Sequence, residues 1–217
     1  MTTPPDQRDL WIANYGEHPQ PAERPSAFVA TCLRLLAPGS HILELGCGSG
    51  TDAATFAAAG HHVTATDFVP AVIEANRERH AALNTLAFQE MRIDEPYTFP
   101  DATFDAVYAH LTLHYYTHRK THEIIKEVHR VLKPGGLLLF ACKSPADPAY
   151  GKGVELESNL FDFHGKVRHF FDPAYARVLL EPRFTGVEVT EHTGKLYRQK
   201  AGWITVVAQA TDPTSTA

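Results

Sequence analysis

The sequence is poor in cysteine, and its three cysteines form none of the patterns that cross-link a fold. Cys32, Cys47 and Cys142 are far apart, and no C-x-x-C pair occurs. An odd number of widely spaced cysteines argues against a disulfide framework and against a zinc site. The pattern fits a reducing compartment, and we expect a cytoplasmic protein.

Long hydrophobic runs and excess positive charge are absent too. No stretch of about 20 apolar residues occurs, as a membrane-spanning helix would need, and residues 1–30 contain no apolar run with a cleavage site. Lysine and arginine number 20 against 25 aspartates and glutamates, which gives a net charge of -5. Because nucleic-acid-binding proteins are usually basic, we expect neither nucleic acid nor a membrane among the partners.

The composition is that of an ordinary globular domain. The chain has 217 residues, of which 44% are hydrophobic and 21% charged, enough to bury a sizeable core. No internal repeat or low-complexity linker divides it, so we expect a single domain over 1–217. The ends at 1–9 and 211–217 are polar and rich in proline and threonine, and we expect them to be disordered.

Strand and helix patterns alternate along the first two thirds of the chain. Strands are predicted at 41–45, 62–67, 86–91, 104–109 and 137–141, and helices at 25–36, 51–59, 70–82 and 118–132. Two further strands, near 184–191 and 202–210, have no helix between them and must pair antiparallel. The sequence therefore predicts an α/β fold with a Rossmann-like, seven-stranded, mostly parallel sheet, an antiparallel end strand and helices on both faces.

The strongest local signal is the segment 42–50, with the sequence ILELGCGSG. A strand ends here, the chain turns sharply, and a helix begins. Glycines at 46, 48 and 50 would let the backbone approach a ligand where a Cβ atom would collide. Asp67 ends the next strand, where a Rossmann-type fold places an acid that accepts hydrogen bonds from ribose hydroxyls. These features predict a cofactor that contains a nucleoside.

Two cofactors compete for this loop. Gly48-x-Gly50-x-x-Ala53 satisfies the dinucleotide pattern G-x-G-x-x-G/A, yet the turn begins at Gly46, and Thr stands at position 51, where its third glycine would fall. Glu44 would be an unfavourable neighbour for a pyrophosphate, whereas an acid suits the ammonium of S-adenosylmethionine. The charge favours that sulfonium cofactor and leaves an NAD(P)-dependent oxidoreductase as the less favoured alternative.

Four motifs in order resemble the class I S-adenosylmethionine-dependent methyltransferases of the type 11/25 kind. They are residues 44–50 (ELGCGSG), Asp67, residues 99–107 (FPDATFDAV) and residues 128–136 (VHRVLKPGG). The resemblance covers about residues 40–142 and implies a methyltransferase that uses S-adenosyl-L-methionine. The chain length and the region of Arg168, Arg198 and Trp203 are more weakly similar to small-molecule methyltransferases of the tellurite-resistance type.

The resemblance implies a role for each matching position. The glycine loop would approach the methionine part of the cofactor, Asp67 would hold the ribose, and Phe68 would lie beside the adenine. Asp94 would approach the adenine amino group while Ile93 packs on the ring. The full set of expected cofactor contacts is Glu44, Gly46, Cys47, Gly48, Gly50, Asp67, Phe68, Ile93, Asp94 and His110.

Four histidines recur at intervals of four residues, at His110, His114, His118 and His122. One helix would align them on one face. However, His110 falls at the end of a predicted strand, and Thr117 is a suitable N-cap for a new helix. We therefore expect that the four do not share a helix and that no metal is bound, because acidic partners are missing nearby. His118, His122 and His129 are expected on the solvated surface.

Candidate catalytic residues follow from the ends of the predicted strands, where open α/β sheets bind ligands. A hydroxyl or thiol acceptor needs a base, and a histidine that titrates near neutrality can serve. The candidates are His114, His110 and His169, in that order. An acceptor that is already anionic would need only cationic positioning, for which Lys143 and Arg168 are candidates.

Other acceptor contacts are expected from two covering segments. The segment Trp11–Tyr15 would fold over the cofactor, which makes Tyr15 a candidate contact, and Tyr115 would form part of the acceptor wall. Residues 143–171 are expected as a long loop over the acceptor, although the charges of such loops are usually solvated.

The expected reaction is in-line methyl transfer to a small molecule, namely a thiol, hydroxyl, carboxylate or chalcogen oxyanion. Neither the Asn/Asp-Pro-Pro-Tyr motif nor the Pro-Cys motif of nucleic-acid base methylation is present at the corresponding position. A non-catalytic module that binds S-adenosylmethionine is the alternative.

Overall fold

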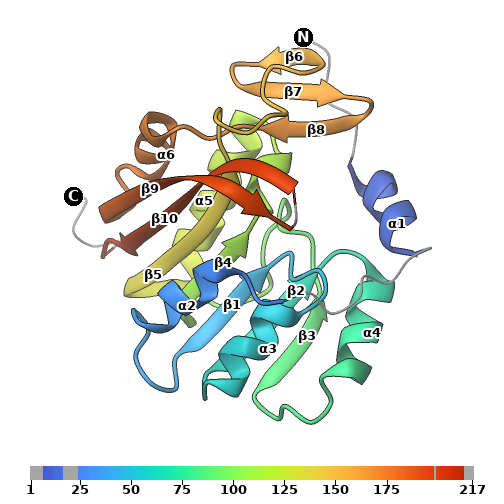
Figure 1. Ribbon diagram of the computed structural model, residues 1–217. Coiled ribbons are helices and arrows are strands. Elements are labelled where there is room, and N and C mark those ends of the chain that lie inside the picture. The colour runs from blue at the N-terminus through green and yellow to red at the C-terminus, as the bar shows by residue number, and fades with distance from the viewer. Residues whose placement is uncertain (1–6, 17–23, 198, 213–217) are drawn as a thin grey trace.

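The computed structural model describes residues 7–16, 24–197 and 199–212. Figure 1 shows a central twisted sheet with helices on both sides and a small second sheet above it. The helices are α1 (Arg8–Gly16), α2 (Ala27–Leu33), α3 (Thr51–Ala58), α4 (Pro70–Arg79), α5 (His118–Val131) and α6 (Pro173–Leu180), with a short 3-10 helix η1 (Leu113–Tyr115).

The large sheet has seven strands, β1 (His41–Leu45), β2 (His62–Asp67), β3 (Leu86–Glu90), β4 (Phe104–His110), β5 (Leu132–Lys143), β9 (Phe184–Leu196) and β10 (Gln199–Ala210). They lie in the order β3-β2-β1-β4-β5-β10-β9. The first five pair in parallel, and β10 pairs antiparallel with both β5 and β9. The predicted Rossmann-like sheet is therefore confirmed. Strand order reverses between β1 and β4, which places a crevice beyond their carboxyl ends.

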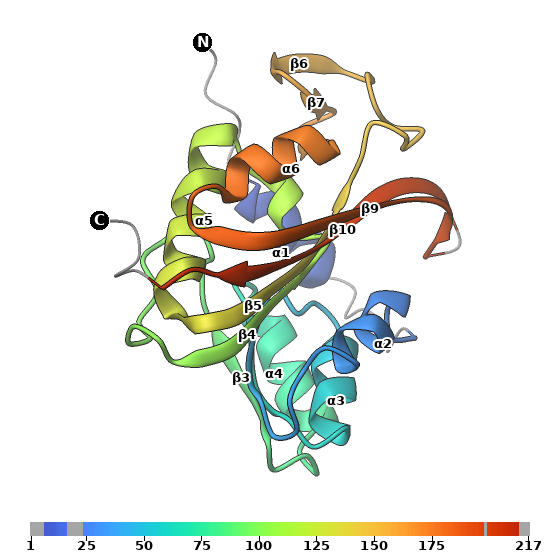
Figure 2. The same ribbon diagram turned by 90° about the vertical axis from the view of Figure 1, so that its left-hand side faces the viewer.

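Helices cover both faces of the sheet, with α2 and α3 on one and α5 and α6 on the other (Figure 2), and each face has its own hydrophobic core. On one face, Phe28 of α2 and Phe56 of α3 pack against apolar side chains of β1, β2 and β4. On the other, α5 and α6 pack against β4, β5 and β10. Helix α5 buries Ile124, Ile125 and Val128 on one side, as its apolar spacing predicts. Burial on both sides explains why the central strands read as nearly continuous apolar runs.

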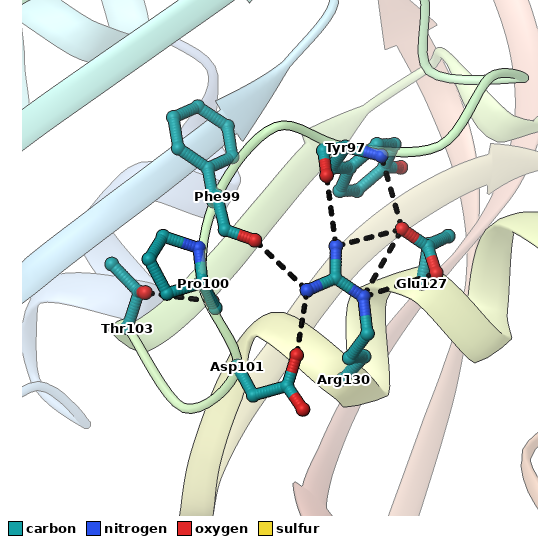
Figure 3. Close-up of polar contacts among 7 residues, drawn as sticks. All are labelled: Tyr97, Phe99, Pro100, Asp101, Thr103, Glu127 and Arg130. Carbon is teal, nitrogen blue, oxygen red and sulfur yellow. Dashed lines mark hydrogen bonds and ion pairs between the residues drawn. The ribbon is translucent and has the colours of Figure 1, made fainter.

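Two of the sequence motifs meet in a structural clamp between α5 and the loop before β4 (Figure 3). The Arg130 guanidinium donates to the carbonyl oxygens of Phe99 and Tyr97, at 2.8 and 3.0 Å. It also pairs with Asp101 at 2.8 Å and with Glu127 at 2.8 Å. Glu127 in turn accepts the Tyr97 backbone N–H at 3.0 Å. These motif residues fix the entry into β4 and do not line the cavity described below.

The segment predicted as a long loop contains a second sheet. Residues 154–169 form three antiparallel strands, β6 (Val154–Glu157), β7 (Leu160–Phe163) and β8 (Lys166–His169). The prediction of a loop over 143–171 is thus wrong. Strands of four residues carry almost no periodic signal, and the turns between them use Asn159 and His164 with positive φ angles of 61° and 55°, which sequence patterns rarely reveal.

The chain ends differ partly from the expectation. Residues 8 and 9 belong to α1 and residues 211 and 212 are ordered, although disorder was predicted for 1–9 and 211–217. Residues 1–6 and 213–217 lie outside the described residues. The extent of the single domain stays a prediction. Among the described helices, none is long and apolar enough to cross a membrane.

Candidate active site

A cavity of about 620 Å³ lies at the carboxyl ends of the parallel strands. Its walls come from the segments after β1, β2, β3, β4 and β5, and from α1, β8 and the turn between β9 and β10. This is the place where open α/β sheets bind ligands, and the volume suits a small molecule. Two parts of the cavity differ in charge, and we call them the acidic half and the basic half.

The acidic half is built on the segments after β1, β2 and β3. Its carboxylates are Glu44, Asp52, Asp67 and Asp94. The basic half is built on the segments after β4 and β5, on β8 and on the β9–β10 turn. Its cations are Lys143, Lys152, Arg168 and Lys200. Arg8 and Arg24 also line the cavity, from the N-terminal part of the chain.

The glycine loop turns through three positive φ angles, 69° at Gly46, 50° at Gly48 and 70° at Gly50. A Cβ atom at Gly46 would lie 2.6 Å from Cγ2 of Thr112, and one at Gly50 would lie 3.0 Å from the Phe88 ring. Gly46, Cys47 and Gly48 line the cavity, but Gly50 does not. The expectation that all three glycines approach a ligand is thus corrected for Gly50, which makes room for Asn76 and Phe88, whereas Gly46 lines the cavity and also lies against Thr112.

Asp67 holds this loop in place from the end of β2. Its carboxylate accepts the backbone N–H of Gly48 at 3.0 Å and that of Val69 at 3.1 Å. Burial raises the pKa of Asp67, and the backbone hydrogen bonds oppose that rise. Phe68 follows directly and also lines the cavity. The structure therefore brings together the strand-end acid and the glycine loop that the sequence singled out.

Glu44 is the most unusual group of the acidic half. Its side chain is only 3% exposed, and its Oε2 atom has no hydrogen-bond partner among the described residues. Burial raises the pKa of Glu44 well above its usual value, and the neighbouring charges of Asp52 and Asp67 raise it further. A buried carboxylate of this kind is costly unless a cation meets it. Glu44 lines the cavity with this unpartnered carboxyl group.

The far end of the acidic half contains Ile93 and Asp94. The Asp94 carboxylate pairs with Arg92 at 2.8 Å, and the Asp94 carbonyl accepts the Lys120 ammonium at 3.1 Å. Sequence patterns gave no sign of this arginine, because the pair spans only two residues within a turn. Ile93 is buried, and it forms part of the cavity wall. Contacts of these residues with adenine stay a prediction.

His110 and His114 both line the cavity at the end of β4. The His110 ring nitrogen Nδ1 lies 3.0 Å from the Tyr197 hydroxyl, which reaches across from the β9–β10 turn. His114 lies in η1, is 1% exposed, and has no hydrogen-bond partner for Nδ1 among the described residues. Burial lowers the pKa of His114 well below its usual value, and Arg168 and Lys143 lower it further. Tyr197 carries no sequence signal, because only the long hairpin brings it to the site.

The basic half contains the predicted cations together with aromatic walls. The Lys143 ammonium pairs with Asp147 at 2.7 Å. Arg168 lies against Tyr115, whose hydroxyl it reaches, and Tyr115 packs edge-on against Trp11 at 5.0 Å. Trp11 comes from α1, and its predicted place over the cofactor stays a prediction, whereas the side chain of Tyr15 lies outside the described part of the structure.

His169 does not lie in the cavity. It is on the opposite side of β8 from Arg168, since neighbouring residues of a strand face opposite ways. Its ring packs against His118 at 4.3 Å and against Phe171 and Tyr175 at 4.6 Å each. The expectation that His169 is a candidate catalytic base is therefore corrected, because it does not line the cavity.

The four regularly spaced histidines do not share a helix, as expected. His110 ends β4, His114 lies in η1, and α5 begins at His118. His122 is exposed, as expected, whereas His118 is partly exposed, with 32% of its side chain accessible, and bonds the Ser158 carbonyl at 2.9 Å. His129 likewise lies 3.2 Å from the Thr211 carbonyl. Across the described segments, no three His, Cys, Asp or Glu side chains gather in a way that could hold a metal ion.

Comparison with known proteins agrees with this geometry. Residues 42–136 match the model of a family described as a methyltransferase domain. The chain is 35% identical over 127 residues to a demethylmenaquinone methyltransferase of Clavibacter sepedonicus, which covers 57% of this chain and 50% of that protein. It is 31% identical over 104 residues to a malonyl-[acyl-carrier protein] O-methyltransferase of Serratia marcescens, covering 48% of this chain and 38% of that protein. The chain thus spans about half the length, or less, of these curated relatives.

A solved structure shares the whole fold. The structure of a methyltransferase from Methanosarcina mazei, described as dependent on S-adenosylmethionine, superposes with a TM-score of 0.72. It is 22% identical and covers 87% of this chain and 99% of its own. The motif order, the cavity and the family match over residues 42–136 agree on a methyltransferase domain that resembles the class I S-adenosylmethionine-dependent enzymes.

Proposed function

We propose that this protein transfers a methyl group from S-adenosylmethionine to a small-molecule acceptor. The observation that carries the proposal is Glu44, a buried carboxylate with an unpartnered oxygen at the cavity wall beside the glycine loop. A nucleoside cofactor with an ammonium group meets that carboxylate. A dinucleotide would instead bring a pyrophosphate next to it, which like charge disfavours.

The acidic half fits this cofactor residue by residue. Glu44 would receive the ammonium, the backbone of residues 46–48 would line the methionine part, and Asp67 would receive the ribose hydroxyls. When bound, the cofactor supplies an electrophilic methyl group on a positively charged sulfur. The described residues hold the acceptor in line and exclude water, because α1, β8 and the β9–β10 turn all contribute walls to the cavity.

The acceptor is proposed to be small because the basic half is walled by the protein itself. Thiols, hydroxyls, carboxylates and chalcogen oxyanions fit this description. The related proteins are named for acceptors as different as demethylmenaquinone and malonyl-[acyl-carrier protein], so the family alone leaves the acceptor open. If a base is used, His110 is the better placed candidate, because it lines the cavity and the Tyr197 hydroxyl holds its ring at 3.0 Å.

Calorimetric titration with S-adenosylhomocysteine, S-adenosylmethionine and NAD tests the proposal. We expect micromolar, one-to-one binding of the first two and none of NAD. Incubation with S-adenosylmethionine that carries a labelled methyl group, with a panel of small acceptors, then tests the transfer. Binding without transfer to any acceptor would favour the non-catalytic module, and binding of NAD alone would favour the oxidoreductase.

A further inference from the structure

The basic half holds more positive charge than the protein itself neutralises. Lys143, Lys166 and Arg168 lie close enough together to affect the same imidazole, that of His114. The carboxylate of Asp147 pairs with Lys143 and also accepts the backbone N–H groups of Ala149 and Gly202. Lys166 and Arg168 make no ion pair with a carboxylate anywhere in the described part of the chain. Among the described residues, Lys143 is thus the one of these three cations that has a carboxylate partner.

Arg168 is the cation best placed to meet a ligand. It lines the cavity, and its Nε atom is buried without a hydrogen-bond partner among the described residues. An arginine fork matches the planar geometry of a carboxylate better than any other side chain does. It reaches the Tyr115 hydroxyl, and Lys143 lines the same cavity with its ammonium paired to Asp147, so a ligand at Arg168 meets a guanidinium that no carboxylate of the described residues neutralises.

Lys166 adds positive charge behind this wall. Its ammonium lies 4.4 Å from the centre of the Trp11 ring and 5.8 Å from that of Tyr115. The aromatic faces stabilise the charge only in part. Burial lowers the pKa of Lys166, and repulsion from Arg168 and Lys143 lowers it further. An anion in the basic half would relieve this repulsion.

Helix α1, which lines the cavity, is attached to the strand that carries Lys166 and Arg168. The Gln7 side chain donates to the Gly165 carbonyl at 2.9 Å and accepts the Val167 N–H at 3.0 Å. Helix α1 is thereby fastened to β8, which lies next to it in Figure 1. Trp11 is thus held next to the strand that carries Lys166 and Arg168.

We propose that the acceptor carries a carboxylate group and that Arg168 binds it, with Lys143 and Lys166 supplying further positive charge. This inference rests on the proposed methyl transfer and names the chemical class of its acceptor. It also removes His114 from the candidate bases. A proton taken up by His114 would add another positive charge beside Arg168 and Lys143, and the His114 side chain is only 1% exposed to solvent that could stabilise it.

Matched pairs of small probes test the proposal on the full chain saturated with S-adenosylhomocysteine. Acetate with acetamide and benzoate with benzamide differ in charge but hardly in shape, and benzoate suits the aromatic wall. We expect at least one carboxylate to bind about tenfold or more tightly than its amide in calorimetry, as a charge-assisted pair does. If no carboxylate of the series binds more tightly than its amide, the proposal is overturned.

Variants of the arginine sharpen the result. In Arg168→Gln we expect the preference for carboxylate to disappear while the affinity for S-adenosylhomocysteine stays unchanged. Arg168→Lys keeps the charge but loses the fork, so an intermediate preference is expected, and it covers the case in which Arg168→Gln does not fold. Arg119→Gln is the matched control, because this arginine is exposed on α5, lies outside the cavity lining and pairs with Glu123.

Two other outcomes are decisive. A carboxylate preference that survives in Arg168→Gln overturns the assignment of Arg168. A loss of S-adenosylhomocysteine affinity in Arg168→Gln also overturns it, because the cations would then serve the cofactor's own carboxylate. Failure of the wild-type chain to bind S-adenosylhomocysteine would instead refute the proposed function, and the comparison of carboxylate with amide could still be made on the ligand-free chain.

Discussion

The two halves of the cavity are built on one sheet, yet one gathers carboxylates and the other gathers cations. In the acidic half, Glu44 and Asp67 are buried carboxylates whose pKa values burial raises. In the basic half, burial and neighbouring cations lower the pKa values of His114 and Lys166. Each half thus bears a charge that the described protein groups do not balance.

This difference in charge suits the two halves to two different ligands. The acidic half lies at the ends of β1 and β2, next to the glycine loop, and suits a cationic cofactor. The basic half lies beyond β4 and β5 and is closed by segments outside the parallel sheet, namely α1, β8 and the β9–β10 turn. The matched family segment, 42–136, includes the first half and ends before most of the second. Acceptor choice can therefore vary while the cofactor site stays the same.

The largest expected effect comes from Asp67→Ala. It removes the acceptor for the Gly48 and Val69 N–H groups as well as the proposed ribose contact, so the affinity for S-adenosylhomocysteine should fall about 100-fold or more. Binding of a carboxylate probe should change less than threefold, because Asp67 lies in the other half. Calorimetry of both ligands measures this, with Glu188→Ala, at an exposed position of β9, as control. Equal losses of both affinities would show that the two halves are not independent.

Gly46, in the loop after β1, contacts Thr112, in the segment after β4, and so connects the two halves. We expect Gly46→Ala to destabilise the fold. The new Cβ atom would meet Thr112 at 2.6 Å, at a φ of 69°, so we expect a loss of about 2 kcal/mol or more in the free energy of unfolding. Gly39→Ala is the matched control. Its φ is 74° with nothing within 4 Å, and about 1 kcal/mol is expected from the backbone alone. Similar losses in chemical denaturation would contradict the steric account.

Glu44→Gln should weaken cofactor binding about tenfold while it stabilises the ligand-free protein at neutral pH. The folded-state pKa of Glu44 lies well above 4.5, so the unfolded chain releases this proton first as the pH rises. Its contribution to stability is fully present below pH 4.5 and declines, by at most about 1.4 kcal/mol per pH unit, until the folded-state pKa is passed. Denaturation at several pH values should show this decline in the wild type and a weaker one in Glu44→Gln.

The smallest effect is expected from His114→Gln. If His114 stays neutral and takes no proton, turnover should change by no more than about threefold, whereas loss of a general base costs a hundredfold or more. Steady-state kinetics with an identified acceptor measures it. A large fall in turnover with unchanged cofactor affinity would restore His114 as the base.

Sequence patterns predicted the acidic half far better than the basic half. The glycine loop, Glu44 and Asp67 lie within 24 residues of one another and follow from strand–turn–helix chemistry. The basic half depends on contacts between distant segments, such as His110 with Tyr197, 87 residues apart. His169 failed as a candidate because the face of β8 that it occupies depends on strands too short to detect.

The same limit applies to the glycines. Their positive φ angles could be predicted from the turn, but the partner of Gly46 is Thr112, 66 residues away. Only the fold shows that the Thr112 side chain occupies the space beside Gly46. The parallel sheet itself was predictable because buried strands and helices alternate over the first two thirds of the chain.

The most direct test of the two-half account is a titration of benzoate into the protein, with and without saturating S-adenosylhomocysteine. If each half binds its own ligand, the two occupy the cavity together, and the benzoate affinity with S-adenosylhomocysteine stays within about threefold of its value without it. If S-adenosylhomocysteine abolishes benzoate binding, the two ligands compete for the same cations, and the division of the cavity into a cofactor half and an acceptor half is wrong.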